Sequence, residues 1–192
     1  GNGPYWNDTE RGVTNYVRSD SDGGTGAQNT SSTGAVVSTS STGYAVGTFN
    51  GWNNSSGNYV GWTFRKQPKF FDIVTYTGNG TAGRTVAHNL GSVPGMIIVK
   101  CTSNASRSWS VYHRGMDSSA PEDYYMRLET TGARSDDVGQ WNDTAPTSSV
   151  FTVGDSTYVN NNGESYVAYI FAHNNDDGGF GEPGDQDIIK CG

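Results

Sequence analysis

The chain has 192 residues, of which 33% are hydrophobic and 16% are charged, and this composition suits one or two small domains with a real core. A net charge of −7 argues against nucleic acid as a partner, because binding to phosphates needs a clustered basic surface. The sequence has no run of about 20 apolar residues, so we expect no insertion into a membrane.

Short strands joined by polar turns are predicted along the whole chain. Valine, isoleucine, threonine and aromatic residues alternate with polar residues, whereas leucine occurs only at Leu90 and Leu128. In chain order, the predicted strands cover residues 16–18, 36–39, 44–49, 59–65, 71–76, 85–88, 96–100, 109–113, 124–128, 150–153, 166–172 and 187–190. Strands of this length, separated by turns rich in glycine and asparagine, predict an all-β fold of tandem antiparallel, jelly-roll-like β-sandwich units.

An internal repeat relates the two halves of the chain. Residues 57–64 (GNYVGWTF) match residues 164–171 (ESYVAYIF) at a displacement of 107 residues. Residues 44–47 match residues 151–154 at the same displacement. Residues 70–100 have no counterpart in the first half, so the first copy of the plan is expected to be partial.

The repeat predicts three regions. Residues 1–67 are a partial first β-sandwich repeat, and residues 68–175 are a complete second one. Residues 176–192 are an acidic hinge that leads into the opening strand of a third unit or into a strand donated to a neighbour.

The last predicted strand is a candidate for exchange between copies. Its sequence is similar to that of residues 72–75, which open the complete repeat. Addition of such a strand to a neighbouring copy would build a head-to-tail fibre. The residues expected to exchange are Asp187, Ile188, Ile189 and Lys190.

The order of motifs across residues 68–192 carries a family resemblance. The motifs are FDIVTYTGNGT, a His-Asn-Leu-Gly turn, VPGMIIVK, WSVYHRG, WNDTAPTSSVFTVG, SYVAYIFAHN and DIIKCG. This order resembles a domain that is repeated in virion structural proteins of marine bacteriophages, including phages of cyanobacteria. Residues 5–67 resemble the second half of the same pattern. The resemblance implies a tail fibre, another appendage or a capsid-associated adornment protein, and it assigns no catalytic residue.

An acidic stretch near the C-terminus is a candidate cation site. Asp176, Asp177 and Asp185 offer hard oxygen ligands on a glycine-rich loop, which suits Ca²⁺. Their spacing fits no EF-hand, and a solvated hinge between units explains the same residues. We predict no other cofactor, because the three histidines lie far apart in the sequence.

Tryptophans beside polar turns are the candidate binding residues. Trp6, Trp52 and Trp141 occupy such positions, where an exposed indole can stack on a sugar ring or contact a protein. The alternative, which we favour for Trp141, is that the indole closes one end of a sandwich. Trp52, flanked by asparagines, is expected to be the most exposed.

The sequence predicts no enzyme. It has no Gly-x-Ser-x-Gly turn, and its glutamates lie in or beside polar turns instead of pairing within an aromatic cleft. Cys101 and Cys191 fit no metal-binding spacing, and the sequence leaves their pairing open.

The expected function is that of a non-enzymatic bacteriophage virion protein, which acts by assembly and by binding a host surface or a partner. Its expected partners are other virion proteins, copies of itself and a host-surface glycan, and its expected location is the virion. The alternative is a secreted or cell-surface bacterial adhesin or carbohydrate-binding module that forms fibres.

Overall fold

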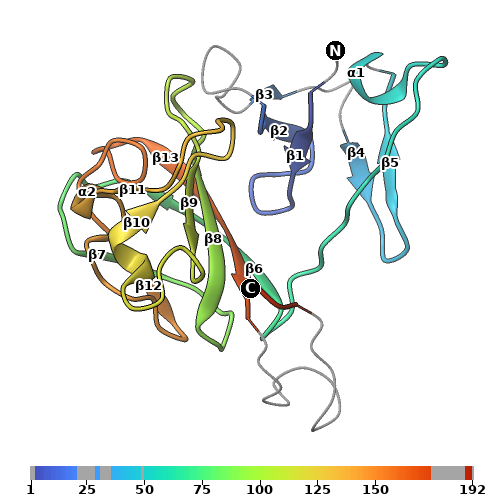
Figure 1. The fold of residues 1–192 in the computed structure, drawn as a ribbon. Coiled ribbons are helices and arrows are strands. Elements are labelled where there is room, and N and C mark those ends of the chain that lie inside the picture. Colours follow the sequence, from blue (N-terminus) through green and yellow to red (C-terminus); the bar gives the residue numbers. More distant parts are fainter. Residues whose placement is uncertain (1–2, 21–28, 31–35, 49, 174–188, 192) are drawn as a thin grey trace, which may run out of the picture.

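The computed structural model describes residues 3–20, 29–30, 36–48, 50–173 and 189–191 (Figure 1). In these ranges the chain forms antiparallel strands with only short helical turns, and the all-β prediction is therefore confirmed. Within the same ranges, no helix is long and apolar enough to cross a membrane.

A four-stranded antiparallel sheet lies at the centre of the fold, with the strand order β6-β13-β8-β9. β13 is buried on both faces from its second residue onwards, as expected for a strand with a neighbour on each side. It pairs with β6 from Phe171 opposite Phe71 to Ser165 opposite Thr77, and with β8 along its other edge. The four strands are β6 (Phe71–Thr77), β13 (Ser165–Ala172), β8 (Pro94–Cys101) and β9 (Ser110–His113).

A second, smaller sheet covers the first face of this central sheet. It consists of β7 (Arg84–Ala87) and β12 (Val150–Val153), which pair with each other. Tyr166, Ala168 and Ile170 of β13 point into the core between the two sheets. Because side chains alternate along a strand, the residues between them point to the opposite face.

The N-terminal hairpin covers the second face of the central sheet. It consists of β1 (Tyr5–Asn7) and β2 (Asn15–Arg18), and β3 (Asn29–Thr30) pairs with β2. Val17 of β2 is fully buried in one cluster with Val167 and Tyr169 of β13. Trp109 Nε1 donates a hydrogen bond of 2.9 Å to the Arg18 carbonyl oxygen, which ties the hairpin to the sheet.

The remaining elements are short. The β4–β5 hairpin and α1 precede the long stretch of chain that leads to β6 (Figure 1). α2 begins at Asp137, whose side chain accepts a hydrogen bond of 2.9 Å from the Gly139 N–H. These elements are β4 (Val36–Thr39), β5 (Tyr44–Val46), α1 (Asn50–Asn53), η1 (Pro121–Asp123), β10 (Tyr124–Tyr125), β11 (Ser135–Asp136) and α2 (Val138–Trp141).

The strand predicted at residues 59–65 is wrong, because these residues belong to no strand. A strand needs backbone partners, and no described strand lies in register beside this stretch. Of the predicted strand at residues 187–190, the first two residues lie outside the described chain. Ile189 and Lys190 belong to no strand, and Ile189 packs against the core.

The two cysteines are unpaired and lie at opposite ends of β8. Cys101 is the last residue of this strand, whereas Cys191 lies against Gly95 at its start. Both side chains are buried. The length of the strand between them exceeds the reach of a disulfide several-fold.

Candidate binding surface

Residues 59–64, the 59–64 segment from here on, carry the two most exposed large apolar side chains of the described chain. Val60 retains 79% and Trp62 81% of their accessible surface. Tyr59 and Phe64, at the ends of the segment, each retain 48%. Large exposed apolar side chains that are contiguous in this way mark contact sites far more often than isolated ones do.

The backbone of this stretch is as open as its side chains. Among the described residues, none forms a backbone–backbone hydrogen bond with residues 60–65. Figure 1 shows the chain crossing from α1 to β6 here as a long stretch without secondary structure. The segment therefore offers both apolar side chains and backbone N–H and C=O groups to a partner.

The two ends of the segment are fixed by contacts. The Tyr59 hydroxyl accepts a hydrogen bond of 3.0 Å from the Asn54 N–H. The Phe64 ring lies 5.5 Å from the Phe71 ring and 5.6 Å from the Phe171 ring, measured between centroids. Val60 and Trp62 lie on the stretch between these anchors.

Lys66 also fastens the chain just after the segment. Its Nζ atom donates a hydrogen bond of 3.2 Å to the Ile73 carbonyl oxygen of β6. The same ammonium lies 2.9 Å from Glu10 Oε1 and 3.1 Å from Asp72 Oδ1. Burial opposes the charged form, but these two carboxylates together raise the pKa of Lys66.

The hydrogen bonds around the segment recur 107 residues further along the chain. The Asn54 N–H to Tyr59 Oη bond has its counterpart in a bond of 2.8 Å from the Asn161 N–H to Tyr166 Oη. Two further pairs connect Asn53 Nδ2 to Gly47 O and Asn160 Nδ2 to Gly154 O, and Gly57 N to Asn54 O and Glu164 N to Asn161 O. At the same offset, Ser40 N to Gly43 O recurs as Thr147 N to Val150 O, and Ser19 N to Pro4 O as Met126 N to Val111 O. The offset places the 59–64 segment on β13.

The environments at the two places are opposite. Val167, the counterpart of Val60, is 0% exposed, and Tyr169, the counterpart of Trp62, is 3% exposed. The other pairs, given as exposed residue and buried counterpart, are Tyr44 and Phe151, Tyr59 and Tyr166, and Phe64 and Phe171. One plan of turns therefore leads into a covered strand in one place and an uncovered stretch in the other.

A contact on the other side of the segment follows the same correspondence. Gly61 packs so closely on the Tyr44 hydroxyl that a Cβ atom built at Gly61 would overlap it. The counterparts of these two residues, Ala168 and Phe151, belong to one buried core cluster. The pairing of β5 with the segment in space thus resembles the pairing of β12 with β13, without the layer that covers the latter.

Trp6 and Trp52 are only partly buried, and aromatic neighbours hold both. Trp52 lies 4.7 Å from the Tyr5 ring, measured between centroids, so it is not the most exposed tryptophan as expected. Trp6 lies 5.0 Å from the Tyr169 ring, and its Nε1 atom donates a hydrogen bond of 2.9 Å to Ser19 Oγ. Trp6 therefore helps to join the N-terminal hairpin to the sheet.

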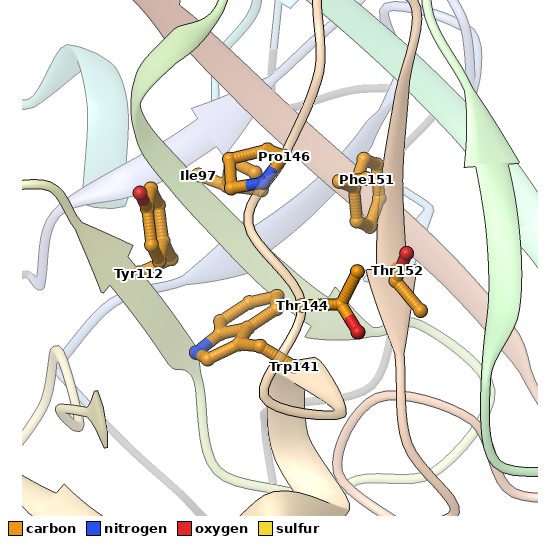
Figure 2. A pocket seen from close by; sticks show the side chains of 7 residues that line it. All are labelled: Ile97, Tyr112, Trp141, Thr144, Pro146, Phe151 and Thr152. Atoms are coloured by element: carbon orange, nitrogen blue, oxygen red, sulfur yellow. The ribbon is translucent and has the colours of Figure 1, made fainter. Parts of the chain in front are cut away.

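Trp141 is buried, and the prediction that it offers an exposed binding ring is wrong. The side chain ends α2 with 2% of its surface exposed. Figure 2 shows its ring beside Tyr112 and near Thr144. The crevice around it leaves no volume that a water molecule could occupy. It is lined by Ile97, Tyr112, Trp141, Thr144, Pro146, Phe151 and Thr152.

A buried polar cluster joins the N-terminal hairpin to β13. Arg11 Nε donates a hydrogen bond of 2.6 Å to Asp8 Oδ2, and the Tyr169 hydroxyl donates one of 2.9 Å to the same oxygen. Arg11 also donates to the Tyr169 hydroxyl at 3.0 Å. Burial raises the pKa of Tyr169 well above its usual range, with the neighbouring Asp8 carboxylate adding to the effect. Every group in the cluster has a partner, so it fits a structural joint better than a catalytic site.

A second polar cluster lies where β13 begins. Burial alone would raise the pKa of Glu164, but hydrogen bonds from Arg107 and Asn104 lower it to about 2. The Arg107 guanidinium donates to Glu164 at 3.2 Å, and Asn104 Nδ2 donates at 2.7 Å. The carboxylate therefore stays charged and paired, which fixes the turn that leads into the strand.

The proposed calcium ligands Asp176, Asp177 and Asp185 lie outside the described residues, as do Asp187 and Ile188. Among the residues that the structure does describe, no three or more His, Cys, Asp or Glu side chains gather in a way that could hold a metal ion.

Sequence reasoning missed Val60 and Trp62 as binding residues, because it placed them in a covered strand. A usable signal was the repeat itself. The stretch matches β13, yet the counterparts of β6 and β8 are missing from the matched part of the first repeat.

Comparison with protein families gives a match over nearly the whole chain. A family model described as a domain of unknown function, DUF7483, matches residues 4–184. No curated protein and no solved structure matches the chain.

Proposed function

We propose that this chain, which belongs to the DUF7483 family, is a non-enzymatic assembly and binding protein whose contact surface is the 59–64 segment. The observation that carries the proposal is the exposure of Val60 and Trp62, at 79% and 81%, on a stretch without backbone partners. Covering a large apolar side chain stabilises a contact by roughly 1.5–3 kcal/mol. A partner that covers both side chains would therefore gain several kcal/mol.

The finer proposal is that the protein belongs to a virion, as a tail fibre, an appendage or a capsid-associated protein made of tandem jelly-roll-like sandwich units. It is supported by the resemblance of the motifs in residues 68–192 to repeated phage structural domains. The hydrogen bonds that recur at an offset of 107 residues also favour a tandem organisation. Other virion proteins, copies of the chain and a host-surface glycan are the proposed partners.

The exposed indole of Trp62 favours one second candidate, a secreted or cell-surface adhesin or carbohydrate-binding module. A ring that is 81% exposed can stack on the face of a sugar. Glycan-array binding that is lost in Trp62→Ala, together with absence of the protein from purified phage particles, would favour this alternative over the virion protein.

Association of the purified chain tests the proposed contact surface. We expect sedimentation velocity to show concentration-dependent association of the unmodified chain, and Val60→Thr and Trp62→Ser to weaken it at least about tenfold, because each removes apolar surface. Val138→Thr is the matched control, because Val138 is also exposed, at 57%, and lies on α2 away from the segment.

Two results would contradict the proposal. One is association that is equal in the unmodified chain, Trp62→Ser and Val138→Thr. The other is a chain that neither associates with itself nor binds isolated phage particles or glycans. Mass spectrometry of purified particles tests the virion location separately.

A further inference from the structure

We propose that the 59–64 segment is an uncovered equivalent of β13, and that a strand of the β6 type from a second copy of this chain pairs with it. The inference rests on the proposed assembly function and names its partner. It identifies the contact as strand addition, in which backbone hydrogen bonds give affinity and alternating side chains give specificity.

The local correspondence is the first step. The Asn54 N–H bonds to the Tyr59 hydroxyl as the Asn161 N–H bonds to the Tyr166 hydroxyl. Tyr166 is the second residue of β13, so the same turn delivers the chain to the start of a strand in both places. The residues that follow are therefore placed to continue as a strand once a partner is present.

The side chains give the second step. Val60, Trp62 and Phe64 alternate along the segment, as Val167 and the later apolar residues do on one face of β13. Tyr169 of β13 lies opposite Ile73 of β6. A β6-type strand in the same register would place an isoleucine beside Trp62, a pairing of aromatic and β-branched residues that stabilises sheets.

The backbone gives the third step. Residues 60–65 form no backbone–backbone hydrogen bond within the described chain, so strand addition would break none. The anchors at Tyr59 and Phe64 hold the ends of the stretch before a partner arrives. Fewer conformations are then lost on binding, which lowers the entropic cost.

The repeat and the sheet order identify the occupant. β6 is the strand that pairs with β13 over seven residues, and it also ends the described four-stranded sheet. A second copy therefore presents the outer edge of a β6 strand without unfolding. Because one copy would give the 59–64 segment and the other its β6 edge, the contact is heterologous and propagates head to tail.

A peptide with the sequence of residues 69–79 (KFFDIVTYTGN) tests the pairing. We expect the labelled peptide to bind the intact chain in fluorescence anisotropy, and a scrambled peptide not to bind. Val60→Pro should weaken binding at least about tenfold, because proline removes a backbone donor and obstructs a paired strand. Trp62→Ser should weaken it through lost side-chain contact.

Val138→Pro is the matched proline control. Val138 is exposed and is the first residue of α2, a position that tolerates proline because its N–H has no partner within the helix. We expect this variant to bind the peptide as the unmodified chain does. Both proline variants should keep the thermal midpoint of the unmodified chain.

Three results would overturn the inference. The unmodified chain would fail to bind the peptide, Val60→Pro would bind it as tightly as the unmodified chain, or Val60→Pro would lower the thermal midpoint, which would place the strand pairing inside one chain. If binding survives in Val60→Pro but is lost in Trp62→Ser, strand addition is wrong while the proposed apolar contact surface stands.

Discussion

The 59–64 segment and β13 share a sequence pattern and differ in almost every tertiary contact. Val167 of β13 has neighbours on both sides and on both faces, and none of its surface is exposed. Val60, its counterpart, keeps 79% of its surface exposed and lies in no strand. The difference teaches that these residues form a strand because of their neighbours, since the preference of a sequence for strand depends strongly on its context.

The turns before the two stretches behave in the opposite way. Asn53 and Asn160 donate equivalent side-chain hydrogen bonds, of 3.0 and 2.8 Å, although the first is exposed and the second is buried. Side chains of asparagine can satisfy backbone groups a few residues away without help from a sheet. Turn geometry is thus encoded locally here, whereas the strand is completed by distant parts of the chain.

Paired substitutions to aspartate should give the largest contrast between the two stretches. Val167→Asp would bury an unpaired charge in the centre of the sheet, and we expect a loss of more than about 4 kcal/mol or failure to fold. Val60→Asp should change the free energy of unfolding by less than about 0.5 kcal/mol, because the side chain stays in water. Urea denaturation measures both. Equal losses would show that the 59–64 segment is covered in the isolated chain.

Removing the buried ion pair should give the next largest effect, because this pair holds the N-terminal hairpin on β13. Arg11→Met would leave the Asp8 carboxylate buried without its cation, and we expect a loss of about 3–5 kcal/mol. Arg18→Met is the control, since the Arg18–Asp20 pair is largely exposed and should contribute about 1 kcal/mol or less. Similar losses in both variants would show that the hairpin docks without this joint.

The sequence predicted the strands of the central sheet closely, because alternation along a strand is a local signal. The residues predicted at 166–172 and 150–153 form β13 and β12 with little or no change in their bounds. The short helices were missed, since a single turn such as α1 has too few residues to show helical periodicity.

The candidate site was harder to predict, because exposure depends on which distant strands are present. Trp141 and Trp62 illustrate the two errors. Trp141 flanks a turn, as an exposed ring would, yet β12 and β9 residues cover it. Trp62 lies in a strand-like pattern, as a core residue would, yet it is 81% exposed. Local pattern was informative about the direction of the side chains and uninformative about what covers them.

The recurring asparagine hydrogen bond offers a smaller and sharper comparison. Asn160 Nδ2 donates to Gly154 O and to Thr81 O, and its Oδ1 accepts from the Asn79 N–H at 3.0 Å. We expect Asn160→Ala to cost about 2–3 kcal/mol, because it leaves buried backbone groups without partners. Asn53→Ala removes the equivalent bond at an exposed site and should cost less than about 0.5 kcal/mol. Thermal unfolding of both variants checks the difference, and equal costs would contradict the assigned contrast in burial.

The smallest expected effect concerns the residue before β13, where the two copies differ chemically. Glu164 is paired with Arg107, whereas its counterpart in the first copy is Gly57. Because the pKa of Glu164 falls from 4.5 to about 2 on folding, its carboxylate stabilises the folded chain fully above pH 4.5, and this contribution is lost as the pH falls towards 2.

We therefore expect Glu164→Gln to lower the free energy of unfolding by about 1 kcal/mol at pH 7 and by progressively less as the pH falls through this window. Urea denaturation between pH 2.5 and pH 7, compared with the unmodified chain, measures the difference, and subtraction cancels the titration of the other carboxylates. Arg107→Met should flatten the same window, because it removes the cation that holds the Glu164 pKa down. A constant difference between Glu164→Gln and the unmodified chain across this range would mean that the glutamate has the same pKa in the folded and unfolded states.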